Sequence, residues 1–349
     1  MDSLTITQPD DWHLHLRDGD QLISVIADTA ARFGRAVVMP NLKPPVVSVA
    51  QALGYRERIL AARPPGSAFE PLMTLYLTAD TTPAQIQQVA ATPQVVGVKL
   101  YPAGATTNSE AGVTSLDALT PVFEAMAEHA VPLLIHGETT DPNDDVFDRE
   151  ARFVDGALTR LHGRHPELKI VLEHITTADA VAWIGETGPR TAATVTAHHL
   201  LLNRNAIFSG GLRPHHYCLP VLKRERHREA LVEAATSVAN TGKYFLGTDS
   251  APHSIANKHS ACGCAGIYTA HAAIELYAEV FEAAGALDRL EAFASFHGPD
   301  FYGLPRNRVM LNLVREAWTV PETLSLGDEL LVPLRAGERV RWRIAAQPS

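Results

Sequence analysis

Short apolar runs alternate along the chain with longer stretches in which apolar residues recur at helical spacing. This alternation is typical of a parallel sheet whose strands are joined by crossover helices. The runs lie at 12–15, 35–40, 72–77, 95–100, 133–136, 169–174, 193–196 and 244–248. Eight strands of this kind predict an α/β fold, a closed (β/α)8 TIM-like barrel.

The stretches between these runs are predicted to be helices. One of them has apolar residues at helical spacing from Leu116 to Met126, with Thr114 and Ser115 as candidate N-terminal caps. Others are predicted at 49–62, 221–239 and 267–284.

After Gly303 the pattern changes to a proline-punctuated tail with short strand candidates at 329–333 and 338–344. We expect this C-terminal extension, about 306–349, to cover the barrel rather than to form a domain of its own. Residues 1–349 are therefore predicted to form a single domain, with a barrel core at about 10–305.

Composition narrows the choice of partners. With 46% hydrophobic and 20% charged residues, a chain of 349 residues can bury a large core. Its net charge of -9, without a stripe of Lys and Arg, argues against a nucleic-acid partner. The first residues carry neither a basic leader nor an apolar segment, and no later run is long enough to span a bilayer. We therefore expect a cytoplasmic protein without membrane contact, in which an anionic substrate would need local cations.

The cysteines are Cys218, Cys262 and Cys264. An odd number in a long chain, and a Cys-Gly-Cys spacing unlike the paired Cys-x-x-Cys of structural zinc sites, favour reduced thiols. They could still lie near one another and compete for a metal.

Polar residues follow the predicted strands at the ends where the loops of a barrel enzyme form its active site. Residues i and i+2 of a strand point to the same face, so His13 and His15 can present two imidazoles to one ion. A single His-x-His is weak evidence, but side chains at the ends of several strands would converge on one mouth. Together they favour zinc or another divalent transition ion. The candidate ligands are His13, His15, His136, His174 and Asp249.

Lys99 ends a strand with a buried pattern and would face cations. An ammonium beside a divalent metal is electrostatically unfavourable, so the amine could react with carbon dioxide to give a carbamate that bridges two metals. Alternatively, the stem of Lys99 packs while its ammonium reaches solvent. Spacing alone does not decide between the two.

Several motifs occur in order between about Asp10 and Pro305. They are His13-Leu14-His15 with Arg17, Val98-Lys99-Leu100-Tyr101-Pro102, His136-Gly137-Glu138, Glu173-His174-Ile175-Thr176 and Gly247-Thr248-Asp249-Ser250-Ala251-Pro252-His253. In sequence and separation they resemble the dihydroorotases of the amidohydrolase superfamily, in their shorter, homodimeric class. The resemblance weakens after about Asn307.

The resemblance implies two zinc ions per subunit in a (β/α)8 barrel. His13, His15 and Asp249 would hold one ion, His136 and His174 the other, and Lys99, carbamylated to N6-carboxylysine, would bridge them. It implies that the enzyme interconverts (S)-dihydroorotate and N-carbamoyl-L-aspartate in de novo pyrimidine synthesis. Asp249 would be the catalytic residue that carries the proton to the leaving nitrogen.

The resemblance also implies residues that bind the substrate. Arg17, Asn41 and His253 would hold its carboxylate, for which the guanidinium of Arg17 offers a planar fork. Two threonines of a mobile loop would close over the substrate, and backbone groups would bind the ring. These residues are Thr106 and Thr107 for the loop, and Leu219 and Ala265 for the backbone groups.

Two further histidine pairs, His198-His199 and His215-His216, exceed the ligand set that the resemblance implies. We interpret them as structural residues or as residues behind the ligands. The thiols of Cys262 and Cys264 follow His253 in the chain, where they can lie near the site without binding the working metals.

Two other functions are weighed against this one. A hydantoinase, dihydropyrimidinase or allantoinase would use much the same metals, but dihydropyrimidinase substrates lack the carboxylate that Arg17, Asn41 and His253 suit. A non-catalytic homologue would keep the fold and lose ligands; the complete ligand set argues against it. The partner is thus expected to be a small molecule, and a homodimer is implied by the resemblance.

Overall fold

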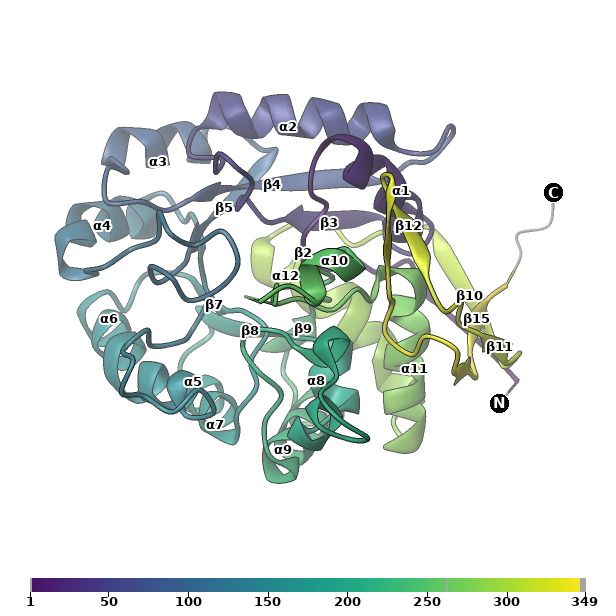
Figure 1. The fold of residues 1–349 in the computed structure, drawn as a ribbon. Helices are drawn as coiled ribbons and strands as arrows, with labels where there is room; N and C mark the ends of the chain where they lie inside the picture. The colour runs from purple at the N-terminus through teal and green to yellow at the C-terminus, as the bar shows by residue number, and fades with distance from the viewer. Residues whose placement is uncertain (1, 262, 346–349) are drawn as a thin grey trace.

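The computed structural model describes residues 2–261 and 263–345 and contains, within them, a sheet of eight parallel strands in the order β2 to β9. Helices surround this sheet on its outside (Figure 1). The predicted (β/α)8 barrel is confirmed, with each strand within a few residues of its expected place. The strands are β2 (Asp11–Leu14), β3 (Arg35–Val38), β4 (Glu70–Tyr76), β5 (Val95–Leu100), β6 (Leu133–Ile135), β7 (Ile170–Leu172), β8 (Thr191–Val195) and β9 (Tyr244–Leu246).

The barrel closes where its first and last strands meet. The amide of Asp249 donates to the carbonyl of His13 at 2.8 Å, and the amide of His15 donates to the carbonyl of Ser250 at 3.0 Å. Below this point the buried Asp11 carboxylate accepts from the amide of Thr248 at 2.9 Å and from its hydroxyl at 2.5 Å. This seam therefore sets His13, His15 and Asp249 side by side.

The helices agree with the sequence pattern in their positions and differ at some ends. The helix predicted at 49–62 matches α2, whereas α9 and α11 are shorter than the helices predicted at 221–239 and 267–284. Thr114 and Ser115 were wrong as caps, because the chain first forms a 3-10 turn (Asp117–Leu119) and α4 then begins at Thr120 without a side-chain cap. The helices are α1 (Gly19–Ala30), α2 (Val49–Ala62), α3 (Pro83–Ala90), α4 (Thr120–Glu128), α5 (Arg149–Phe153), α6 (Thr159–Arg164), α7 (Ala178–Glu186), α8 (Ala197–Leu201), α9 (Glu225–Thr236), α10 (Ile255–Lys258), α11 (Ala273–Ala283) and α12 (His297–Tyr302).

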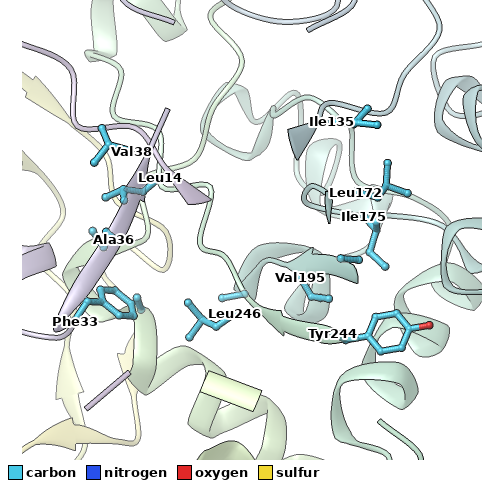
Figure 2. Packing of buried hydrophobic residues seen from close by; sticks show 14 of the residues in the cluster. Leu14, Phe33, Ala36, Val38, Ile135, Leu172, Ile175, Val195, Tyr244 and Leu246 are labelled. Carbon is cyan, nitrogen blue, oxygen red and sulfur yellow. The ribbon is translucent and has the colours of Figure 1, made fainter. Parts of the chain in front are cut away.

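Alternate residues of each strand enter two separate apolar clusters. In β9, Tyr244 and Leu246 join the large cluster between strands and helices, whereas Phe245 joins a small cluster inside the barrel. Figure 2 shows part of the large cluster, with Leu246 near Val195. Because both faces are buried, the strands read as nearly continuous apolar runs.

The bottom of the barrel is filled by aromatic side chains. Trp12 is fully buried, stacks on Tyr302 of α12 with ring centroids 4.5 Å apart, and meets Phe245 edge to face. The polar residues lie at the opposite end of the barrel.

Gly298→Ala is expected to destabilise the protein by about 1–3 kcal/mol, because overpacking a filled core forces side chains or backbone to shift. A methyl group at Gly298 would lie 1.9 Å from Nε1 of the buried Trp12. Chemical denaturation measures the loss. Gly163→Ala in α6, where no atom lies within 4 Å of the added methyl group, is the control. Equal stability of the two variants would contradict the packing argument.

The tail folds back onto the N-terminus. β10 (Met310–Val314) pairs with β1 (Ser3–Thr7), a strand that the sequence pattern did not predict, and with β15 (Arg343–Ile344). Trp342 is fully buried in the large apolar cluster. Figure 1 shows β10 and β15 beside one another at one edge of the barrel. The other short strands are β11 (Trp318–Thr319), β12 (Leu324–Leu326), β13 (Glu329–Leu331) and β14 (Arg339–Val340).

Among the helices that the structure describes, none has the length and apolar character needed to cross a membrane.

Candidate metal centre

The six predicted ligands lie at or just beyond the carboxyl ends of β2, β5, β6, β7 and β9, as expected. Apart from His15, which is partly buried, their side chains are buried, and that of Lys99 is 0% exposed. Such a concentration of titratable groups in the interior is costly unless the groups serve one another or a ligand.

His13, His15 and Asp249 form a compact set of donors. One oxygen of Asp249 lies 3.4 Å from Nε2 of His13 and 3.1 Å from Nε2 of His15, and the donor atoms of the three residues lie within 4.8 Å of one another. Leu14 points the other way, into the large apolar cluster. The i, i+2 argument for the two histidines therefore holds.

His136 and His174 continue this set. The ring of His174 lies between those of His13 and His136, with centroids 4.8 Å and 4.9 Å away. Lys99 belongs to the same group: burial lowers the pKa of His136 and His174, and the charge of Lys99 lowers it further. All six predicted ligands are thus brought to one place.

Buried atoms without partners test whether these residues fit a metal. Within the described residues, Nε2 of His13, Nδ1 of His174 and Nζ of Lys99 are buried and make no hydrogen bond. A buried polar atom without a partner costs about 1–3 kcal/mol. Imidazole nitrogens that lie together with a carboxylate are a donor set suited to zinc-like cations. The residues present fit a metal.

The charges at the centre favour ligand forms of the side chains. Burial lowers the pKa of Lys99 to about 8 and that of His15 to about 4, so both lose their protons more readily than in water. Burial alone would raise the pKa of Asp249, but the imidazoles of His13 and His15 beside its carboxylate hold this pKa well below its usual value. Asp249 is therefore a carboxylate, His15 is a neutral imidazole, and Lys99 is an amine that can take its neutral form.

Glutamates orient two of the imidazoles from behind. Oε2 of Glu173 lies 2.9 Å from Nδ1 of His13 and accepts from the hydroxyl of Thr194 at 2.5 Å. Oε2 of Glu138 likewise lies 2.8 Å from Nε2 of His136. Such partners fix which ring nitrogen faces the metal. Both glutamates lie within the recognised motifs, but nothing in the sequence assigned them this role.

The turn that carries His174 is fixed by a third buried carboxylate. Glu150 on α5 accepts hydrogen bonds from the amides and hydroxyls of both Thr176 and Thr177, at 2.6 to 2.9 Å. Thr177 also caps α7. No sequence signal pointed to Glu150, which lies outside the motifs.

Glu173→Gln is expected to weaken metal binding by about 10- to 100-fold, the usual cost of losing a partner behind a metal-bound histidine. The amide would no longer offer a charged acceptor to Nδ1 of His13. Metal content after dialysis against graded chelator measures the effect. Glu167→Gln, which removes an exposed carboxylate beside Arg190, should leave metal affinity unchanged. Wild-type metal retention in Glu173→Gln would argue against this role.

Backbone strain gathers at the same place. Among the described residues, the non-glycine positions with positive φ include Arg17 at 60°, His174 at 40° and Asp249 at 45°. Such conformations cost of order 1–3 kcal/mol and cluster at functional sites. Three of the candidate site residues are therefore held in backbone conformations that their own side chains disfavour.

The predicted substrate-binding residues lie beside this centre. The guanidinium of Arg17 lies 2.9 Å from Nε2 of His253 and donates to the carbonyl of Pro252 at 3.0 Å. Arg17 and Asn41 also line a cavity of about 430 Å³, together with Lys43 and Arg58. The acidic chain thus places local cations at a cavity beside the metal centre.

The predicted loop, which carries Thr106 and Thr107, is hydrogen-bonded to other segments at this end of the barrel. The side chain of Asn41 donates to the carbonyl of Thr107 at 3.0 Å, and the hydroxyl of Thr107 donates to the carbonyl of Ala265 at 3.3 Å. The amide of Thr106 bonds instead within the loop, to Ser109. Leu219 is partly buried.

The cysteines lie in different surroundings. Cys218 is buried and Cys264 is partly buried, and both are free thiols. Cys262 lies outside the residues that the structure describes.

A model of the amidohydrolase family matches residues 9–308. This match spans the whole barrel and every candidate ligand. The chain therefore belongs to the amidohydrolase family, the class that its barrel and its cluster of histidines indicate.

Relatives define the branch of that family. Dihydroorotase from Nitrosomonas europaea is 63% identical over 346 residues, which cover 99% of each chain. The structure of dihydroorotase from Campylobacter jejuni has a TM-score of 0.90 at 35% identity and covers 99% of this chain and 98% of its own. Dihydroorotase from Saccharomyces cerevisiae, in complex with 5-fluoroorotic acid, has a TM-score of 0.91 at 34% identity over the full length of both chains. Within the family the branch is that of the dihydroorotases, enzymes that act on a cyclic amide.

Proposed function

We propose that this site interconverts (S)-dihydroorotate and N-carbamoyl-L-aspartate in pyrimidine synthesis, with two zinc ions and a carbamylated Lys99. The observation that carries the proposal is a set of buried donors on His13, His174 and Lys99 that make no hydrogen bond among the described residues, beside the guanidinium of Arg17, which donates to Nε2 of His253. The first fits metal-assisted amide hydrolysis, and the second fits an anionic substrate.

His13, His15 and Asp249 would hold one cation, and His136 and His174 the other. Bound there, the cations would lower the pKa of water and polarise an amide carbonyl. The low pKa of Lys99, about 8 as a result of burial, supplies the neutral amine that adds to carbon dioxide. The carbamate so formed carries a negative charge in place of the ammonium, which removes the repulsion between Lys99 and the cations.

Asp249 is proposed to move the proton in ring opening. A water oxygen bonds to the ring amide carbon, the carbon–nitrogen bond breaks, and the nitrogen gains the proton that the water loses. The carboxylate of Asp249 is unprotonated, buried among histidines and fixed by the barrel seam. It can therefore accept the proton and return it to nitrogen, and the reverse sequence closes the ring.

Arg17 is proposed to bind the substrate carboxylate, with Asn41 and His253 beside it. Thr106 and Thr107 would close over the bound molecule, and backbone groups of Leu219 and Ala265 would meet the ring. The bond between Thr107 and Ala265 supports this, because it links the loop to a segment on the other side of the mouth. Closure would exclude water from the reacting atoms.

Arg17→Gln is expected to raise KM for dihydroorotate by about 100-fold, since a charge-assisted bidentate bond contributes about 3 kcal/mol at most. kcat should change far less, because Arg17 is not among the proposed ligands. Steady-state kinetics separate the two. Arg58→Gln, which lines the same cavity but pairs with Asp18, is the control. A fall in kcat at unchanged KM would contradict a binding role.

The proposal as a whole is tested with zinc-supplemented protein and three substrates: dihydroorotate, dihydrouracil and hydantoin. Preferred turnover of dihydroorotate supports it. Turnover of the uncharged rings alone would indicate a dihydropyrimidinase, and no turnover despite bound metal would indicate a non-catalytic homologue.

Two further parts of the proposal concern the whole chain. Tail residues such as Trp342 join the same apolar cluster as the strands, which supports one domain over residues 1–349. A homodimer is proposed on the resemblance alone, and the molar mass in solution tests it.

A further inference from the structure

A second group of metal donors lies beside the candidate centre and shares no residue with it. The group consists of His198 and His199 on α8 and of Cys218, whose donor atoms lie within 4.8 Å of one another. The three side chains are buried, with 0%, 2% and 1% exposure. We name them the α8 cluster.

The imidazole of His198 is the part of this cluster that points to a ligand. Both of its ring nitrogens are buried and, among the described residues, neither has a hydrogen-bond partner. Because each unsatisfied buried polar atom costs about 1–3 kcal/mol, an apolar side chain at this position would be better unless a ligand is bound. The ring of His198 lies 4.5 Å from that of His199. The unpartnered nitrogens are therefore placed next to another donor.

The distances within the α8 cluster are close to those of a tetrahedral site. Nε2 of His199 and Sγ of Cys218 are 3.8 Å apart. Zinc with bonds of about 2.1 Å to nitrogen and about 2.3 Å to sulfur places these two atoms about 3.6 Å apart. The carbonyl oxygen of Pro220 lies 3.0 Å from Nε2 of His199 and 3.2 Å from Sγ of Cys218. With His198, the cluster therefore offers two nitrogens, one sulfur and a nearby oxygen.

The surroundings of His199 allow either the metal-free or the metal-bound form. The hydroxyl of Thr196 lies 2.8 Å from Nδ1 of His199 and can donate or accept. In the metal-free form Nε2 donates to the carbonyl of Pro220. If Nε2 binds a cation, the ring proton moves to Nδ1. Nδ1 then donates a hydrogen bond to the hydroxyl oxygen of Thr196. No polar atom of the His199 ring is then lost to solvent or left unpaired.

The charge near Cys218 also bears on cation binding. Burial and the carboxylate of Asp249 raise the pKa of the Cys218 thiol to about 12, and the ammonium groups of Lys258 and Lys223 offset this rise in part. The two ammonium groups repel a further cation, and the negative charge of the thiolate offsets this repulsion. Loss of one proton from Cys218 to solvent accompanies binding, so a divalent ion adds a single net charge to the cluster.

We propose that His198, His199 and Cys218 bind one zinc-class transition-metal cation, distinct from the catalytic pair. Nitrogen and sulfur donors select such a cation over magnesium or calcium, which require oxygen ligands. The cation ties α8, which follows β8, to the segment that carries Leu219 between Cys218 and Pro220. It is a structural site whose occupancy holds one wall of the proposed substrate site in place. The inference stands on the α8 cluster and does not need the proposed reaction.

Cobalt(II) provides the test, because thiolate-bound cobalt has a near-ultraviolet charge-transfer band that histidine and carboxylate ligands do not produce. Protein stripped of metal by dialysis against a chelator is titrated with cobalt(II), and absorption and bound metal are measured together. We expect a thiolate band in the wild type and about one additional metal per chain compared with Cys218→Ser. Cys262→Ser and Cys264→Ser are the controls and keep the band.

Each outcome decides the matter. Loss of the band in both Cys218→Ser and His198→Gln supports the site. A band that survives in Cys218→Ser, or a wild type that binds cobalt without one, overturns it. To separate ligation from misfolding, the melting temperature is measured with and without zinc: zinc stabilises the wild type more than either variant. Equal stabilisation of all three also overturns the site. An inactive protein that shows the thiolate band would contradict the proposed reaction alone.

Discussion

Replacement of Lys99 by alanine is expected to lower kcat/KM for dihydroorotate by about a thousandfold or more, equivalent to about 4 kcal/mol of transition-state stabilisation. The methyl group cannot form a carbamate, so each of the two proposed cations loses one ligand. Bound metal should fall together with activity. Steady-state kinetics and metal analysis of the dialysed protein measure both.

The stability of the metal-free protein is the control for Lys99→Ala. The ammonium of Lys99 is 0% exposed and makes no hydrogen bond within the described residues, so the removal of this charge should not lower the free energy of unfolding. A folded, metal-poor and inactive variant is thus expected. Normal turnover with a normal zinc content would contradict the carbamate.

Asp249→Asn is expected to reduce kcat by about 10³- to 10⁴-fold, at the upper end of what a proton-transfer group contributes, because Asp249 is also a proposed ligand. The amide keeps the size of the side chain but cannot accept the proton from water. Metal binding should weaken less than in Lys99→Ala, since His13 and His15 remain. Rapid-mixing kinetics of zinc-saturated protein measure the chemical step.

The control for this variant is Asp300→Asn, which removes an exposed carboxylate paired with Arg306 and should leave kcat unchanged. If Asp249→Asn retains a substantial part of the wild-type kcat at saturating zinc, the proton is carried by another group.

The barrel and its ligands could be predicted from the sequence because both follow local rules. Runs such as Leu133–Ile135 are apolar on both faces and end directly at a polar residue, which indicates a buried parallel strand with a functional end. The four histidines and Asp249 were found in this way, whereas Lys99 was added as a ligand only by the resemblance of the motifs to a family. The N-terminal strand Ser3–Thr7 was missed because its partner, Met310–Val314, lies at the other end of the chain.

The parts of the site that could not be predicted depend on contacts between distant residues. Glu150 lies outside the motifs, and only the folded chain places it under Thr176 and Thr177. The left-handed backbone of His174 and Asp249 leaves no mark on the residue types. The pair His198-His199 was interpreted as structural or as lying behind the ligands, because pattern alone could not show that Cys218 joins it.

The barrel seam has a consequence for the order in which this protein matures. His13 and His15 emerge early in synthesis, whereas Asp249 follows the last barrel strand, and the hydrogen bonds between these segments join the start of the barrel to its end. A growing chain holds the two imidazoles but not the carboxylate that completes their set. Stable loading of the proposed first cation is therefore expected only after the ring of strands has closed. On this proposal, metal capture marks a barrel that is already complete and fastens the junction that joins the two ends of the ring.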